Sequence, residues 1–369
     1  MKPILAIVTE AIRRDIHYPL KYFTHFRVVH FYNRIPYGDM TPDDFKSSVQ
    51  AVQFDTPAKL NDLLKKLMPN IIQGAEPYAS RKALRYSLAA QKAARRVGAK
   101  FVFPMLENRP PQERFGRPVA YIMKKILRRY ATKSDLIFTL NDGARKNLLD
   151  IGVTDEKIMP FFWGLWGVDA ELFTPEENGK EPDWQLPTAL FIGRLVPEKG
   201  IRDILQAFAI LTNVTPAQLV FVGCGPMQNE IDGYTNSGDE RSQITRYDVM
   251  AQDKLPPLMR ASALVIYPSV TTPKWEEQVG TVNLQAMSCG VPVVSTLSGA
   301  IPEYVPEGKA GLLVPENNPQ ELARAMLTII QDKELRRRMG EYGRRYILEN
   351  FDIKDNIAKG EEMLLELLQ

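Results

Sequence analysis

Short apolar runs alternate with amphipathic segments along the whole chain. The apolar runs are ILAIV, RVVHFY, NIIQGA, KFVFPM and DLIFTL in the first half, and TALFIG, QLVFVG, SALVIYP, VPVVST and GLLVP in the second. Near-continuous apolar runs of this length are typical of parallel strands whose two faces are both covered. Segments whose apolar residues have helical spacing lie between or after these runs. They are 81–97, 119–131, 200–212, 281–289 and 318–331. The pattern therefore predicts an α/β protein with two sets of parallel strands.

A polar segment rich in proline, glycine and acidic residues, PEENGKEPDWQLP, separates the two sets of strands. A chain of 369 residues is also too long for one ordinary core. We therefore predict a first Rossmann-like domain over 1–172, a linker over 173–187 and a second Rossmann-like domain over 188–350. The tail from Lys333 has a helical pattern that breaks near 350–352, and we expect 351–369 to pack back toward the first domain.

Charge is distributed unevenly between the two halves of the chain. The net charge is +3, yet residues 1–170 carry 28 Lys and Arg against 16 Asp and Glu. Segment 81–133 alone has fifteen basic residues and two acidic ones. Such asymmetry favours an anionic partner, either a membrane surface, a phosphate-bearing acceptor or nucleic acid. Nucleic acid is disfavoured because few aromatic side chains interleave with the basic ones, and a pair of solvated helices is the plain alternative.

The sequence contains no pattern of a membrane-spanning or disulfide-rich protein. No apolar run approaches the ~18–20 residues that a transmembrane helix needs, and the apolar run at the start is shorter than a signal-peptide core. Cys224 and Cys289 are too few for a disulfide framework and wrongly spaced for zinc. We expect a cytoplasmic protein, with peripheral contact between 81–133 and the inner face of the plasma membrane as an open alternative.

The first motif with chemical content is GRLVPEKG, which follows the run TALFI and precedes a helical segment. A strand end, a glycine and a helix N-terminus together form a common phosphate-binding arrangement. Arg194 and Lys199 add two cations that can neutralise a diphosphate. The motif is not a dinucleotide fingerprint and has no Walker lysine, so by itself it is equally compatible with an ordinary exposed loop.

The second motif, WEEQVGTVNLQAMSCGVPVVST, is more specific. Glu277 precedes a glycine turn at Gly280, after which a helix is predicted from about Thr281 and a buried strand follows. The start of this helix offers free backbone N–H groups at the carboxyl edge of the sheet, where open parallel sheets bind their ligands. Two helix N-termini, two cations and a carboxylate together suit an anionic sugar nucleotide.

In this order and spacing the motifs resemble the group 1 (family four) retaining glycosyltransferases of GT-B fold. The resemblance is carried by GRLVPEKG, FVGCGP, YPSVTTPKWEEQVGTVNLQAMSCGVPVVSTLSGAIPEYV and GLLVP, and more loosely by segments of the first half such as IIQGAEPYASRK and FPMLENRP. It implies an α/β protein with two Rossmann-like domains whose parallel sheets face each other across a central cleft. It also implies transfer of a hexose-type sugar from a UDP- or GDP-sugar to a saccharide or lipid-linked acceptor, in surface polysaccharide or glycolipid assembly.

The resemblance further assigns roles to individual residues. Arg194 and Lys199 would bind the donor's diphosphate, and Glu277 would hold the hydroxyls of the donor sugar; these three are the expected catalytic residues. The expected donor-binding positions are Gly193, Gly280, Thr281, Val282 and Gln285. The resemblance implies no metal and no cofactor besides the donor itself. The leaving diphosphate would be stabilised by fixed charge, and the acceptor hydroxyl would enter from the same face.

The chain departs from the family pattern at two places. Where the pattern has a second glutamate for the ribose hydroxyls, this chain has Gln285. Its amide can still accept a neutral hydrogen bond but lacks the charge, and the expected loss is about 1 kcal/mol. Where many relatives have a histidine, this chain has Glu107 and Asn108. We expect Glu107, Asn108 and Glu76 to orient the acceptor or the donor sugar, although a loop or capping carboxylate is the open alternative for both glutamates.

Two alternative functions stay open for the whole chain. One is a degenerate, non-catalytic sugar-nucleotide-binding protein, and the other is a nucleotide-sugar epimerase.

Overall fold

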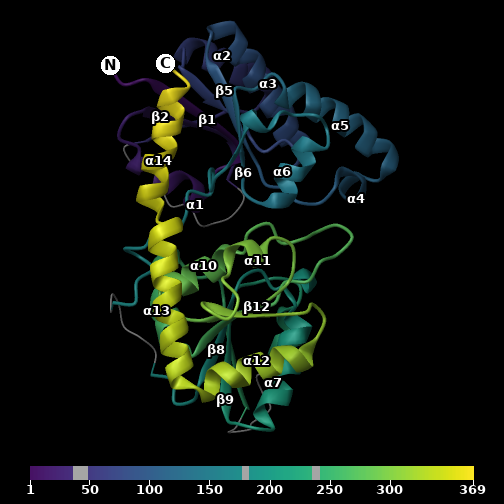
Figure 1. Cartoon of the computed structure of the whole chain (residues 1–369), viewed down its shortest axis with the longest axis vertical. Helices are drawn as coiled ribbons and strands as arrows, with labels where there is room; N and C mark the ends of the chain where they lie inside the picture. Colours follow the sequence, from purple (N-terminus) through teal and green to yellow (C-terminus); the bar gives the residue numbers. More distant parts are fainter. Residues whose placement is uncertain (36–48, 177–182, 235–241) are drawn as a thin grey trace. The chain divides into compact units, whose positions relative to one another are not determined.

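The computed structural model describes residues 1–35, 49–176, 183–234 and 242–369. These residues form two compact units (Figure 1). The first unit contains Met1–Gly167 together with Ile353–Gln369, and the second contains Val168–Asp352. Residues 168–172, which the sequence assigned to the first domain, therefore lie with the second unit. Part of the predicted linker 173–187, residues 177–182, lies outside the described residues.

The first unit is built around a parallel sheet with strand order β3-β2-β1-β4-β5-β6-β7. Its strands are β1 (Ile4–Ala11), β2 (Arg27–Arg34), β3 (Gln50–Gln53), β4 (Ile71–Gln73), β5 (Lys100–Met105), β6 (Leu136–Thr139) and β7 (Ile158–Pro160). The order reverses between β1 and β4, which are hydrogen-bonded neighbours in the sheet. This reversal is the topological switch point at which doubly wound sheets place their ligands.

Helices cover both faces of this sheet. They are α1 (Arg14–His17), α2 (Pro57–Leu67), α3 (Arg81–Val97), α4 (Pro111–Phe115), α5 (Arg117–Ala131), α6 (Asp142–Leu149) and α14 (Ile353–Glu366). Helix α3 shows why the sequence forms a helix here: the Ser80 hydroxyl accepts a hydrogen bond from the Ala83 N–H at the start, and Gly98 ends it in a left-handed conformation. Its alanine-rich face packs into the core of the unit.

The last helix, α14, packs into the first unit although it follows the second in sequence. Ile353, Ile357 and Leu364 share a buried cluster with Trp163. The Glu361 carboxylate is fully buried and accepts hydrogen bonds from the N–H groups of residues 24–26 at 3.0, 2.7 and 3.1 Å. These bonds satisfy a buried charge that would otherwise be costly, so α14 is fixed by polar as well as apolar contacts.

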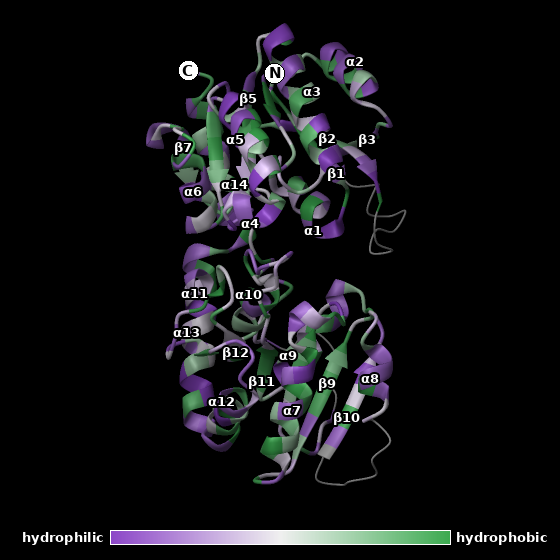
Figure 2. Cartoon of the chain, turned by 90° about the vertical axis from the view of Figure 1, so that its right-hand side faces the viewer, coloured by the Kyte–Doolittle hydropathy of each residue, from purple (hydrophilic) through white to green (hydrophobic). Residues whose placement is uncertain are grey.

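The second unit contains a parallel sheet with strand order β10-β9-β8-β11-β12-β13. Its strands are β8 (Thr188–Ile192), β9 (Ala217–Val222), β10 (Ser242–Tyr247), β11 (Leu264–Tyr267), β12 (Val293–Thr296) and β13 (Gly311–Val314). Taken from β8 onward this is the 3-2-1-4-5-6 order of a Rossmann fold, with its switch point between β8 and β11. Figure 2 shows β9 as hydrophobic, whereas the edge strand β10 is mixed in character.

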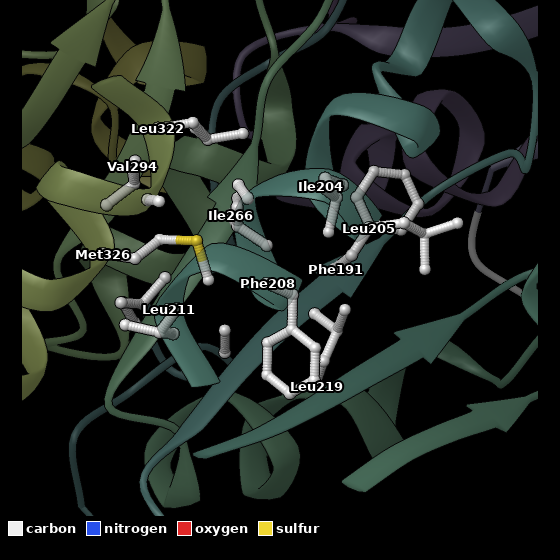
Figure 3. Packing of buried hydrophobic residues seen from close by; sticks show 14 of the residues in the cluster. Phe191, Ile204, Leu205, Phe208, Leu211, Leu219, Ile266, Val294, Leu322 and Met326 are labelled. Atoms are coloured by element: carbon white, nitrogen blue, oxygen red, sulfur yellow. The ribbon is translucent and has the colours of Figure 1, made fainter. Parts of the chain in front are cut away.

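The helices of the second unit pack against its sheet, and a large apolar core lies between the sheet and helices α7 and α12. They are α7 (Ile201–Thr212), α8 (Gln228–Asp232), α9 (Leu255–Ala261), α10 (Thr281–Ser288), α11 (Ile301–Tyr304), α12 (Pro319–Gln331) and α13 (Lys333–Asn350). Phe208 and Leu211 of α7 meet Met326 of α12 over the strand residues Phe191 and Ile266 (Figure 3). Burial of this apolar surface holds the strand ends in place.

The predicted elements are confirmed for the buried strands and the long helices. The sequence did not predict β3, β7 and β10, which lie at or next to the edges of their sheets and have short or mixed patterns. Within the described residues, no helix is both long enough and apolar enough to cross a bilayer. The exposed face of α5 carries Val119, Tyr121 and Ile122 next to basic side chains, but membrane contact through 81–133 stays a prediction.

Candidate functional site

Two loops of the second unit approach each other at its switch point. One is 193–200, which follows β8, and the other is 268–280, which follows β11. The Val270 N–H donates to the Glu198 carbonyl at 2.9 Å. Gly200 has a φ of 67°, and any side chain on it would collide with the Pro268 carbonyl. A glycine is therefore required where the two loops touch.

A buried ion pair joins the two loops. The Lys199 Nζ donates to the Glu277 Oε2 at 2.6 Å and also to the Tyr267 hydroxyl. Glu277 accepts a second hydrogen bond, from the Ser269 hydroxyl, at 2.7 Å. The Lys199 ammonium also lies 4.5 Å from the ring centres of both Tyr267 and Trp275. The two charged residues are only 6% and 7% exposed, so each depends on the other for compensation of its charge.

Arg194 lies on the open side of this pair. Its side chain is 56% exposed, and its Nη2 is 3.9 Å from the Glu198 Oε1. Its positive charge acts on both Lys199, whose pKa it lowers, and Tyr267. Arg194 therefore provides an accessible cation next to a buried one, which suits a ligand carrying more than one negative charge.

The N-terminus of α10 lies next to the same carboxylate. Gly280 caps the helix with φ 74° and ψ 55°, and the position of a side chain on it would be 3.7 Å from the Glu277 Cγ. The N–H groups of Thr281 and Val282 belong to the first turn, where backbone donors have no partner within the helix. Gln285 follows one turn later and is partly exposed. The helix thus presents partial positive charge near Glu277.

Burial shifts the pKa of two groups in this site. Burial lowers the pKa of Lys199, and the charge of Glu277 opposes that shift. Burial also raises the pKa of Tyr267 well above its usual value, and the Glu277 charge raises it further. The tyrosine hydroxyl is therefore neutral at physiological pH. Among residues 1–35, 49–176, 183–234 and 242–369, no three His, Cys, Asp or Glu side chains gather as a metal site.

The predicted residues of the first unit form a separate group at the ends of β4 and β5. The Glu107 carboxylate is 3% exposed and accepts from the Arg109 Nε at 2.8 Å, and its Oε2 lies 2.9 Å from the Arg114 Nε. Glu76 follows β4, and its pKa is raised to about 8, first by burial and then by the charge of Glu107. Asn108 is partly exposed beside them.

The structure thus brings together most of the predicted residues in two groups, one in each unit. In the second unit Arg194, Lys199, Glu277 and Gly280 converge. Gly193 lies at the end of β8, where its N–H donates to the Val222 carbonyl at 3.0 Å. The functional roles of all these residues stay predictions.

Sequence reasoning missed the residues that surround the two carboxylates. These are Tyr267, Ser269 and Trp275 around Glu277, and Arg109 and Arg114 around Glu107. A signal was present for the first set, because Tyr267 is the last residue of a buried strand and strand ends line ligand sites. The two arginines follow Glu107 by two and seven residues, Arg109 in a loop and Arg114 in the short helix α4, and no periodicity marks them.

Comparison with known proteins finds a family model that matches part of the chain. Residues 175–346 match the model of the glycosyl transferases, group 1. The chain is 32% identical over 196 residues to a D-inositol 3-phosphate glycosyltransferase of Corynebacterium jeikeium, covering 48% of this chain and 45% of the relative. It is 29% identical over 171 residues to an N-acetyl-alpha-D-glucosaminyl L-malate synthase of Bacillus anthracis, covering 46% and 43%. The chain thus spans less than half the length of these curated relatives.

A solved structure resembles the chain over its whole length. The HepE protein of Anabaena, crystallised in complex with UDP, has a TM-score of 0.77 at 18% identity, with 99% of this chain and 100% of that chain covered. The predicted resemblance to group 1 glycosyltransferases and the predicted fold of two Rossmann-like units are confirmed. The finer assignment to family four and the stereochemistry of transfer stay predictions.

Proposed function

We propose that this chain, whose residues 175–346 match the group 1 glycosyl transferases, transfers a hexose-type sugar from a UDP- or GDP-sugar with retention and without a metal. The acceptor in this proposal is a saccharide or a lipid-linked saccharide of surface polysaccharide or glycolipid assembly. One observation carries the proposal: the buried Lys199–Glu277 pair lies at the switch point of the second unit, flanked by an exposed Arg194 and the N-terminus of α10. The complex of HepE with UDP favours a uridine donor.

The charges of this site match those of a nucleotide sugar. The diphosphate would contact the Arg194 guanidinium, the Lys199 ammonium and the first N–H groups of α10. The Glu277 carboxylate would accept hydrogen bonds from hydroxyls of the donor sugar. A lysine ammonium has three N–H donors, and Tyr267 and Glu277 accept two of them. The third can reach a phosphate oxygen without breaking the buried ion pair.

The chemistry follows from fixed charge rather than from a strong base. As the bond between sugar and phosphate breaks, the negative charge that develops on the leaving diphosphate is stabilised by Arg194, Lys199 and the helix N-terminus. The acceptor hydroxyl then attacks from the same face and gives its proton to a departing phosphate oxygen. Most of the rate acceleration would come from positioning of the two substrates.

Donor binding tests this proposal directly. UDP or GDP at 100 times its dissociation constant should stabilise the protein by about 2.7 kcal/mol, measured as a thermal shift. Arg194→Ala should weaken nucleotide binding and slow sugar transfer by about tenfold or more, because a charge-assisted contact to the diphosphate is lost. Arg202→Ala is the matched control, since Arg202 is an exposed arginine paired with Glu230 on the same unit. Equal binding by both variants would contradict the assignment of the diphosphate site.

Gln285→Glu should strengthen donor binding several-fold. The glutamate would restore a charge-assisted hydrogen bond to a ribose hydroxyl, a gain of about 1 kcal/mol. Parallel titrations of the wild type and the variant with UDP measure this gain. The wild type should nevertheless transfer sugar. Activity in the variant alone would instead identify the natural protein as a degenerate, non-catalytic relative.

A further inference from the structure

Buried polar atoms without a partner gather in the first unit around Glu76. The Glu76 Oε1, the Tyr78 hydroxyl and the Arg109 Nη1 are all buried, and none of them finds a hydrogen-bond partner among the described residues. Arg109 is 4% exposed and Tyr78 is 2% exposed. A buried polar atom without a partner costs about 1–3 kcal/mol, so three of them close together call for an explanation beyond folding.

The charges in this group do not balance. Both Arg109 and Arg114 form ion pairs with the Glu107 carboxylate, through their Nε atoms at 2.8 and 2.9 Å. Glu76 lies near Glu107, and its pKa of about 8 keeps it largely protonated at neutral pH. Two guanidinium groups therefore face one negative charge, and the group as a whole is positive.

Hydrogen-bond donors also outnumber acceptors. The protonated Glu76 carboxyl and the Tyr78 hydroxyl can each donate, and the Arg109 Nη1 can only donate. The Glu107 carboxylate already accepts from the Arg109 backbone and side chain. A ligand that completes this group must therefore supply acceptors and negative charge, as a phosphate, a sulfate or a carboxylate does.

The position of the group fits a binding site. Glu76 follows β4 and Glu107 follows β5, and these strands are neighbours in the sheet, so both residues lie at its carboxyl edge beside the switch point. Arg109 and Glu107 form a buried floor, whereas Arg114 is 26% exposed and Glu76 is half-buried. Arg114 also donates to the Tyr78 carbonyl at 3.2 Å, which ties the two loops together.

We propose that the segments after β4 and β5, the second of which includes helix α4, form a binding site for an anionic group. Arg109 and Arg114 supply the charge of this site, and the Glu76 carboxyl group donates a hydrogen bond. The structure assigns this site to the first unit alone. Where the proposed glycosyl transfer is correct, the anionic group belongs to the acceptor, so the acceptor carries a phosphate or a carboxylate. That last step rests on the proposed function, but the anion site itself does not.

The proposal makes anion binding depend on pH. The charged groups that act on Glu76 are Glu107 and Arg114, and Glu76 in turn acts on the hydroxyls of Tyr78 and Tyr130. The two tyrosines have pKa values raised by burial and stay neutral. Glu76 is therefore the group that titrates, and above about pH 8 its negative charge would repel a bound anion.

Sulfate is the probe of choice because its charge is constant between pH 6 and pH 10. Calorimetric titration at constant ionic strength, with UDP present to occupy the second unit, should show sulfate binding that weakens about tenfold from pH 7 to pH 9. Glu76→Gln should bind sulfate at pH 7 within about threefold of the wild type and lose the pH dependence, because an amide donates but does not ionise. Parallel titrations with methyl phosphate and acetate identify which anion fits better.

Arg114→Gln should weaken sulfate binding about fivefold or more, since it removes a charge-assisted donor. Arg117→Gln is the matched control, because Arg117 is a nearby exposed arginine of α5. UDP binding by Arg114→Gln should equal that of the wild type, which verifies the fold. Equal sulfate affinity in the two arginine variants, or wild-type binding that does not change with pH, would overturn the proposal. Absence of UDP binding in every variant would instead count against the proposed function.

Discussion

Replacing Glu76 by glutamine is expected to stabilise the protein by about 3 kcal/mol at pH 7. The carboxyl group of Glu76 has an ordinary pKa of 4.5 in the unfolded chain and a pKa of about 8 in the fold, where burial and the charge of Glu107 oppose its ionisation. At neutral pH the unfolded chain releases this proton freely, whereas the folded chain retains it. The wild type therefore has a lower free energy of unfolding at neutral pH than the Glu76→Gln variant, because glutamine does not ionise in either state.

The direction of the Glu76 pKa shift determines the pH range over which the stabilities of the variant and the wild type differ. A group whose pKa is raised in the fold contributes its full stability below the unfolded value of 4.5, and that contribution is lost as the pH rises through the folded value of about 8. The difference between Glu76→Gln and the wild type should therefore be small near pH 4.5, grow by about 1.4 kcal/mol per pH unit and level off above pH 8. Urea unfolding at several pH values measures it.

Glu113→Gln serves as the control, because Glu113 is an exposed carboxylate of the neighbouring helix α4. Its unfolding free energy should follow that of the wild type at every pH. A Glu76→Gln variant that tracks the wild type in the same way would show that Glu76 is ionised in the fold. The neutral carboxylic acid in the proposed anion site would then be wrong.

A stabilising substitution at this position also has a functional meaning. Residues that reduce stability while facing a binding site are commonly retained for function rather than for folding. Burial and then the charge of Glu107 raise the pKa of Glu76, and the buried Oε1 of its carboxyl group has no hydrogen-bond partner among the described residues. We therefore expect Glu76→Gln to gain stability and to lose the pH dependence of anion binding.

The buried strands and long helices of this fold could be predicted because their sequence patterns are strong. The strand 188–192 is buried at every position and apolar at all of them except Thr188, since helices cover both faces of a parallel sheet. The strand β10 was missed because four of the six residues in its sequence, SQITRY, are polar, so that this edge strand resembles a loop. The boundary between the two units at Gly167 and Val168 could not be predicted from composition either. Apolar, buried residues lie on both sides of it, so no polar linker marks the boundary.

The candidate site was only partly predictable, because its central contact joins distant motifs. Lys199 and Glu277 are 78 residues apart, and their ion pair results from the neighbouring positions of β8 and β11 in the sheet. The sequence identified both residues as ligand contacts but not as partners of each other. Glu107 is a similar case, since its two arginine partners become visible only when the loop after β5 is folded.

Breaking the Lys199–Glu277 pair should have the largest effect on both stability and donor binding. Lys199→Met leaves the Glu277 carboxylate buried with its Ser269 hydrogen bond but without a cation. Loss of one partner of a buried ion pair typically costs about 3–5 kcal/mol. Lys199→Met should therefore unfold at a clearly lower urea concentration than the wild type, and it should bind UDP at least tenfold more weakly because the ammonium no longer reaches the diphosphate.

A double variant separates the structural role of the pair from its proposed function. Lys199→Met combined with Glu277→Gln removes both charges, and the amide can still accept from the Ser269 hydroxyl. Neutral replacement of a buried ion pair is often tolerated, so this variant should recover more than half of the stability that Lys199→Met loses. Donor binding should not recover, because the positive charge is still missing.

The two measurements together therefore decide the role of the buried pair. Recovery of stability without recovery of UDP binding would mean that the fold tolerates an uncharged pair and that the charges serve the ligand. Recovery of both would mean that Lys199 acts only as a structural partner of Glu277, and Arg194 with the N-terminus of α10 would then have to hold the diphosphate alone. The physical expectation is the first outcome, since within the described residues Tyr267 and Glu277 accept two of the three ammonium hydrogens. A buried cation that can donate a further hydrogen bond beside an exposed arginine is suited to a polyanionic ligand.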